Sequence, residues 1–264
     1  MTTNAPRGLE CPNCGAPLHL GNVACDYCGA TIVTTRATEV VVPAVADAQE
    51  LIPQMRARIE ANAYDGDAYY QLGLACFTLR LYDQAENAFE QAKRLLPGVA
   101  VAHYFAGLAM LYNSQGEVLS APSFRLRQMQ EEFDTALALD PNLVEAQPYR
   151  DFVYGMMARN NEDYAGAIDP LTATVHALPD FALAWHALAA CYFQIGQHQN
   201  AIEAARQALQ RQPNDESSVF LIGSAYAFLK DTAEMEAWAR RLAEIRGEPN
   251  NWQRALRELR GQFD

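Results

Sequence analysis

The sequence predicts a mostly α-helical chain built from repeated helical hairpins, with a small metal-binding module at its start. From about residue 47 onwards, apolar residues follow helical spacing, and prolines close the helical stretches at similar intervals. Glycines recur at one helical position, 34 residues apart at Gly73 and Gly107. Four cysteines form two Cys-x-x-Cys pairs within the first 28 residues. The repeats predict the helical part, and the cysteines predict the metal site.

The composition is that of a folded protein of one or two domains. Of the 264 residues, 50% are hydrophobic and 20% are charged, which excludes a disordered chain. The formal net charge is −12. Nucleic acids and anionic membranes are bound mainly through Lys and Arg, so this balance disfavours both as partners of the whole chain.

The cysteine pairs are separated by ten residues and have the spacing of a four-thiolate metal site: Cys11, Cys14, Cys25 and Cys28. A glycine follows the second cysteine of each pair, as a tight turn requires. This segment resembles a zinc ribbon, which implies one structural Zn²⁺ and a small β-hairpin module. Iron would be held by similar turns. A redox pair would need a βαβ context, and two disulfides would need a secretory signal; the sequence shows neither.

The start of the chain has no apolar signal segment, and no window holds about 18 uninterrupted apolar residues. We therefore expect a cytoplasmic protein without a membrane span. The predicted parts are a zinc ribbon over 1–33, an extended linker over 34–46 and a helical region over 47–264.

The helical region carries a recognisable repeat pattern. Alanines lie seven residues apart in the same register before two of the closing prolines, as at Ala85 and Ala92 before Pro97. In the clearest repeat, the first helix reads Trp185, Leu188, Ala189 and Tyr192. This pattern resembles the tetratricopeptide repeat (TPR) family, which implies a right-handed α-solenoid of about five helix-turn-helix repeats plus capping helices. The implied elements are a leading helix 47–62, repeats 66–99, 100–143, 144–181, 182–215 and 216–249, and a trailing helix 250–261.

Two repeats depart from the 34-residue period. The second carries ten extra residues between Gly107 and Met129, which predicts a longer turn and a longer second helix. The third fits two frames; one of them places Gly155 at the small position of its first helix. Pro170 predicts a kink or a late start in the second helix of that repeat.

One face of each first helix lines the concave groove in TPR proteins. Here it is apolar and aromatic, and the residues predicted to contact a partner are Tyr70, Leu74, Phe77, Tyr104, Leu108, Leu111, His186, Phe193 and Phe220. The face lacks the Lys and Asn pattern that clamps a C-terminal carboxylate. It predicts either a groove for an apolar peptide or internal packing of the aromatic rings. The charge of −11 over residues 47–229 also allows a basic partner segment.

The sequence contains no nucleophile elbow, phosphate-binding glycine loop or His-Glu-x-x-His motif. We therefore expect no enzyme, but a non-catalytic adaptor that binds a protein or peptide through its repeats, with a structural zinc ribbon. The alternative is a nucleic-acid-associated regulator, in which the ribbon contacts nucleic acid and the repeats recruit protein.

Overall fold

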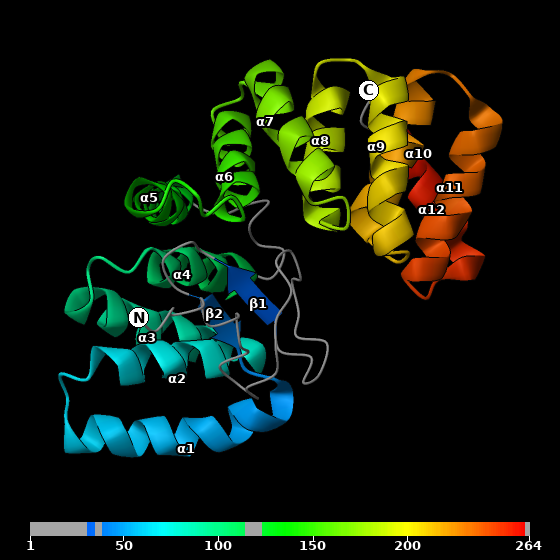
Figure 1. The fold of residues 1–264 in the computed structure, drawn as a ribbon. Helices are drawn as coiled ribbons and strands as arrows, with labels where there is room; N and C mark the ends of the chain where they lie inside the picture. Colours follow the sequence, from blue (N-terminus) through cyan, green and yellow to red (C-terminus); the bar gives the residue numbers. More distant parts are fainter. Residues whose placement is uncertain (1–30, 35–38, 114–122, 262–264) are drawn as a thin grey trace, which may run out of the picture. The chain divides into compact units, whose positions relative to one another are not determined.

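The computed structural model describes residues 31–34, 39–113 and 123–261, and the predicted zinc ligands lie outside these ranges. The chain divides into two compact units. The first comprises residues 1–118 and 128–147, and the second comprises residues 119–127 and 148–264. Within the described residues there are twelve α-helices, and these form a TPR-like solenoid fold, as predicted (Figure 1).

The elements of the first unit are a two-stranded hairpin followed by helices. They are β1 (Thr31–Thr34), β2 (Glu39–Val42), α1 (Val45–Ala61), α2 (Gly66–Thr78), α3 (Tyr82–Leu95), α4 (Ala100–Asn113) and most of α5 (Ser123–Leu139). The strands are antiparallel, with Thr31 opposite Val42 and Thr34 opposite Glu39. This pairing joins two segments that the sequence analysis assigned to different parts of the chain, the ribbon and the linker.

The second unit consists of helices. They are most of α6 (Ala146–Asn160), then α7 (Tyr164–Ala177), α8 (Ala182–Gln194), α9 (His198–Arg211), α10 (Glu216–Phe228), α11 (Thr232–Ile245), the short 3-10 helix η2 (Pro249–Asn251) and α12 (Trp252–Arg260). Consecutive helices from α7 to α12 contact one another, and α8 also contacts α10. The first helices of successive repeats therefore lie next to each other, as a groove requires. Among the described residues, no helix is long and apolar enough to cross a membrane.

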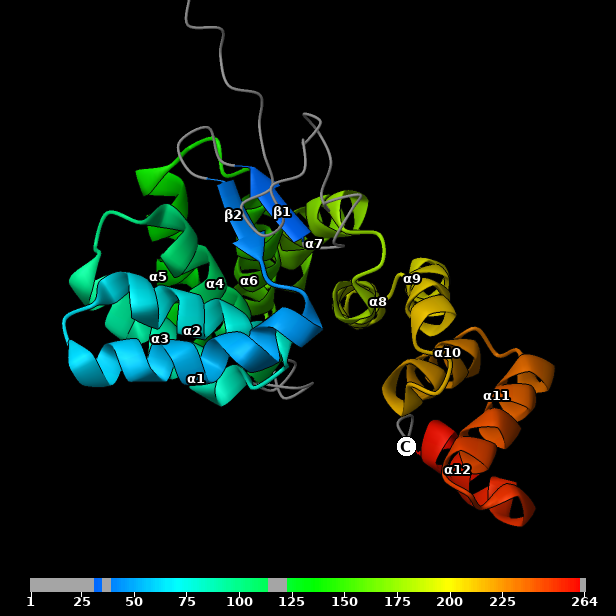
Figure 2. The ribbon, with the colours of Figure 1, turned by 60° about the horizontal axis from the view of Figure 1, so that its bottom comes forward.

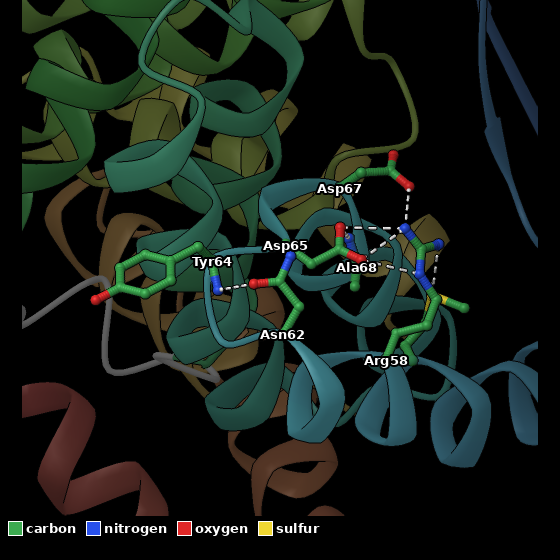
Figure 3. Close-up of polar contacts among 7 residues, drawn as sticks. Arg58, Asn62, Tyr64, Asp65, Asp67 and Ala68 are labelled. Atoms are coloured by element: carbon green, nitrogen blue, oxygen red, sulfur yellow. Dashed lines mark hydrogen bonds and ion pairs between the residues drawn. The ribbon is translucent and has the colours of Figure 1, made fainter.

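Aspartate side chains cap the N-termini of several of these helices. At the start of α2, the Asp65 carboxylate accepts a hydrogen bond from the backbone N–H of Ala68 at 3.0 Å, and this bond lowers the pKa of Asp65 (Figure 3). The same carboxylate accepts a hydrogen bond from the guanidinium of Arg58 in α1. This guanidinium also donates to the carboxylate of Asp67 at 3.1 Å. Equivalent caps are made by Asp163, Asp215 and Asp231. Each satisfies a backbone N–H group that the helix itself leaves unpaired.

Within a repeat, the second helix packs a large side chain into a glycine of the first. A Cβ atom on Gly73 would lie 2.6 Å from the ring of Phe89, and one on Gly107 would lie 2.8 Å from the ring of Phe133. In the third repeat, a Cβ atom on Gly155 would lie 2.6 Å from Leu171. Of the two frames that the sequence left open, the structure therefore has the one that places Gly155 at the small position of the first helix. Helix α7 begins at Tyr164 and continues through Pro170, so it does not begin late.

The turn between the two helices of a repeat holds one residue in the left-handed conformation. Its φ is 58° at Arg80, 63° at Glu162, 78° at Gly196 and 60° at Lys230. The next backbone N–H bonds back into the preceding helix, as from Leu81 to the carbonyl of Cys76 at 2.9 Å. This is the hydrogen-bond pattern that ends many α-helices at a glycine. Three of the four turns use a residue with a side chain instead.

A buried ion-pair network connects three helices of the first unit. The carboxylate of Glu132 in α5 binds the ammonium group of Lys93 in α3, and it bonds to Nδ1 of His103 in α4 at 2.8 Å. The three side chains are 9–15% exposed. Burial alone would raise the pKa of Glu132, but the hydrogen bonds from His103 and Lys93 outweigh it and lower that pKa. The network connects the first repeat to the second.

Candidate peptide-binding groove

Helices α8 and α10 of the second unit enclose an open groove of about 430 Å³. Three residues that the sequence predicts for partner binding, His186, Phe193 and Phe220, line it together. Phe193 and Phe220 are partly exposed and form aromatic walls. The remaining lining residues are Ala190, Gln194, Glu216, Ser217, Leu221, Ser224 and Arg246.

His186 connects the two helices that form the groove. Its Nδ1 lies 2.9 Å from the hydroxyl of Ser218 and 3.5 Å from a carboxylate oxygen of Asp215. Burial lowers the pKa of His186, although the nearby carboxylate of Asp215 opposes this effect. The ring is therefore neutral at pH 7, and it presents a hydrogen-bonding edge without a charge.

The groove contains a buried polar group, the hydroxyl of Ser224, that forms no hydrogen bond within the described residues. The side chain of Ser224 lines the groove and is only 1% exposed. A buried hydroxyl without a partner carries a desolvation cost of about 1–3 kcal/mol. A ligand that offers a donor or acceptor at this point would remove that cost.

One edge of the groove is charged but internally neutralised. Arg246 donates to Glu216 at 2.8 Å and to Glu258 at 2.6 Å. The hydrogen bond with Glu258 contributes most to the raised pKa of Arg246. Because both carboxylates already hold the guanidinium, Arg246 is not free to clamp a ligand carboxylate. This agrees with the absence of a carboxylate-clamp pattern in the sequence.

The equivalent residues of the first unit are placed differently. The five that the sequence assigns to partner binding on α2 and α4, apart from Phe77, are 1–9% exposed: Tyr70, Leu74, Tyr104, Leu108 and Leu111. At two positions, the first unit carries leucines where the second unit carries Ala190 and Ser224. Smaller side chains at these positions hollow the α8–α10 groove.

A cluster of three aromatic rings recurs between neighbouring first helices in both units. In the second unit, His198 stacks on Phe228 with ring centres 4.5 Å apart, and Phe193 meets Phe228 edge-on at 5.4 Å. The first unit repeats this cluster with Phe77, Tyr82 and Tyr112. The sequence analysis missed both clusters. The only signal was the shared spacing, 5 and 35 residues after the first ring.

The predicted metal ligands Cys11, Cys14, Cys25 and Cys28 lie outside the described residues. Within the described part of the chain, no group of three His, Cys, Asp or Glu side chains could hold a metal ion. Cys191 is a buried free thiol, and burial raises its pKa to about 11. It is therefore a protonated packing residue at neutral pH.

The fold and the groove together define a helical-repeat protein with an open surface groove. Comparison of the sequence with protein families matches the tetratricopeptide repeat at residues 66–97 and again at residues 182–215. The chain therefore carries tetratricopeptide repeats, and TPR repeat proteins mediate protein–protein interactions. No curated protein sequence matches the chain.

Several solved structures share the fold at low sequence identity. PilW, a widely conserved type IV pilus biogenesis factor, is 18% identical, with 80% of this chain and 91% of PilW covered and a TM-score of 0.55. YrrB, described as a TPR protein with an unusual peptide-binding site, is 15% identical, with 76% and 96% covered and a TM-score of 0.50. Cut9–Hcn1 of the APC/C is 14% identical, with 80% and 46% covered and a TM-score of 0.52. These likenesses support the fold alone.

Proposed function

We propose that the protein is a non-catalytic adaptor whose α8–α10 groove binds an extended segment of a partner protein. The observation that carries this proposal is the buried, unpartnered hydroxyl of Ser224 on a groove between Phe193 and Phe220. The aromatic walls favour a ligand with a large apolar side chain, and the hydroxyl favours a polar group beside it. TPR folds typically serve as non-catalytic scaffolds, which agrees with this role.

Leucine side chains introduced at Ala190 and Ser224 should fill the groove, and the TPR fold already accommodates leucine at the equivalent positions of the first unit. The first unit already carries Leu74 and Leu108 at the positions of Ala190 and Ser224. The double variant A190L/S224L should therefore fold, and it should block the groove. The variant A177L adds the same side chain at an exposed position near the end of α7, outside the groove. It is the matched control.

The experiment selects random nonapeptides displayed on phage against the full chain and measures the selected peptides by fluorescence anisotropy. We expect them to bind A177L like the wild type and A190L/S224L at least tenfold more weakly. S224A should lose about fivefold, which corresponds to one hydrogen bond of about 1 kcal/mol. Selected peptides that bind A190L/S224L as tightly as the wild type, or a selection that yields none, would refute the proposal.

We also propose that Cys11, Cys14, Cys25 and Cys28 hold one structural Zn²⁺. Four thiolates complete a tetrahedral zinc site and leave no position for a substrate. In zinc-finger peptides, such sites contribute on the order of 10 kcal/mol to folding. Elemental analysis of the purified chain should give one zinc atom per molecule, and C11S/C14S should lose it. One iron atom and a red protein, or no metal, would contradict the proposal.

A further inference from the structure

The first unit has a second candidate binding surface, the α2–α4 face, formed by Tyr70, Leu74, Tyr104, Leu108 and Leu111. All but Leu111 occupy the positions of groove-lining residues in the second unit. All five are 1–9% exposed, whereas Ala190, Phe193 and Phe220 of the groove are partly exposed. Helices α2 and α4 contact each other, so the face is continuous. A face of first helices that is open in one unit is therefore closed in the other.

A strand of the same chain lies at this surface. Strand β2 contacts α2, and the pictures show the β1–β2 hairpin beside the helices of the first unit (Figures 1 and 2). Val42 at the end of β2 is half-buried, and Pro43 directly after it is buried. The exit of the strand is thus packed into the unit.

The occupying segment is short, extended and apolar. Strand β2 reads Glu-Val-Val-Val, and β-branched residues favour the extended conformation. Apolar side chains suit a surface made of leucines and tyrosine rings. The hydroxyl of Tyr70, however, is buried without a partner among the described residues. Burial raises the pKa of Tyr70, so the hydroxyl stays protonated and keeps a hydrogen to donate. The strand therefore leaves one polar group of this surface unsatisfied.

The strand is also tethered closely to the surface. Only Pro43 and Ala44 separate the end of β2 from the start of α1. A short tether gives an effective concentration in the millimolar range, so even a weak contact stays largely closed. A partner segment that also accepts a hydrogen bond from Tyr70 would bind better per residue and could displace it.

We propose that β2 is a built-in ligand of the α2–α4 face, and that this face binds short extended segments rich in β-branched apolar residues. While β2 is bound, the face is closed to other proteins. When β2 is displaced, the first unit offers a binding site separate from the α8–α10 groove. This inference does not depend on the function proposed for that groove.

The test uses a fluorescein-labelled peptide of residues 36–44 and the full chain. Every protein carries A190L/S224L, so the probe cannot bind in the α8–α10 groove. Because side chains of a strand point alternately to opposite sides, V41D and V40D/V42D place the charge on opposite faces of β2. Only one of the two should release the strand from α2, and the other serves as its control.

We expect the releasing variant to bind the probe at least tenfold more tightly than the chain with native β2, and the other variant to bind like that chain. A probe that carries the Asp substitution of the releasing variant should not bind. If neither variant gains probe binding while circular dichroism shows both folded, the strand is only a structural part of the unit and the proposal fails. Should an Asp variant not fold, V41T and V40T/V42T repeat the comparison with β-branched residues retained.

Discussion

The packing of Phe89 against Gly73 makes a strong prediction about the stability of the first repeat. In the variant G73A, the new methyl group would lie 2.6 Å, 2.7 Å and 2.9 Å from three ring carbons of Phe89. Contacts under 3.0 Å require a neighbouring atom to move. The ring of Phe89 is fully buried and stacks on Phe105 at 5.8 Å, with Tyr70 at 6.1 Å on another side. It therefore has little room to turn away.

Two effects of G73A oppose each other. Alanine is favoured over glycine in the middle of a helix by about 1 kcal/mol. Overpacking of a core costs about 1–3 kcal/mol, and the confinement of Phe89 places this site at the upper end. The net expectation is a loss of about 2 kcal/mol in the free energy of unfolding. For a protein of this size, that is a fall in melting temperature of about 4–8 °C.

The assay is urea unfolding of the full chain followed by circular dichroism, with a matched control. A Cβ atom on Gly98 would meet nothing within 4 Å, and its φ lies outside the left-handed region, so G98A should be neutral or slightly stabilising. In the background F89L, where ring atoms are removed, G73A should cost at least 1 kcal/mol less. A G73A protein as stable as the wild type, or a cost unchanged by F89L, would refute the close-approach argument.

Four further variants test three other features. E132Q leaves the buried ammonium group of Lys93 with only the exposed Glu90, at 2.9 Å, as a carboxylate partner, and should cost about 2–4 kcal/mol at pH 7. Because the folded pKa of Glu132 lies below its ordinary value of 4.5, this stabilisation is complete above pH 4.5 and disappears as the pH falls through the folded pKa; the gap between the two urea curves should close with it, and a constant gap would contradict the network. K230G relieves a left-handed residue and should add about 0.5–1 kcal/mol, whereas G196A should lose about 1 kcal/mol; equal stabilities would contradict the turn argument. Y70F removes an unpartnered hydroxyl, so its melting temperature should equal or exceed that of the wild type, and a clear fall would show a missed partner.

Features that repeat along the chain could be predicted from the sequence. Proline spacing and the alanine pairs located the helices, and the glycines of the first helices marked where a second helix approaches, as Gly107 and Phe133 show. The ten extra residues of the second repeat predicted a longer second helix, and α5 has 17 residues where α3 has 14. Such signals are local or periodic, so a single sequence contains them.

Features that depend on partners far apart in the chain could not be predicted. Lys93, His103 and Glu132 come from three helices, and nothing in their local sequence shows that they meet. The pairing of β1 with β2 was also missed, because residues 35–38, Thr-Arg-Ala-Thr, lack the Asn-Gly or Gly type of hairpin signal. The left-handed turns at Arg80 and Lys230 carry no glycine that would announce them.

The groove depends both on the periodic pattern of the sequence and on contacts between residues far apart in the chain. The repeat register placed His186, Phe193 and Phe220 on one face, and all three line the α8–α10 groove. The same register grouped Tyr70, Leu74 and Leu108, which the structure buries. Periodicity identifies the face of a helix, but access to that face depends on side-chain size and on what covers it. Ala190 and Ser224, in place of two leucines, were the sequence signal that one face is hollow. Exchanging these residues between the units is therefore a direct test of what determines access. A190L/S224L should close the open groove. L74A/L108S removes apolar contact surface from the α2–α4 face and should weaken binding of the residue 36–44 peptide to the variant that releases β2.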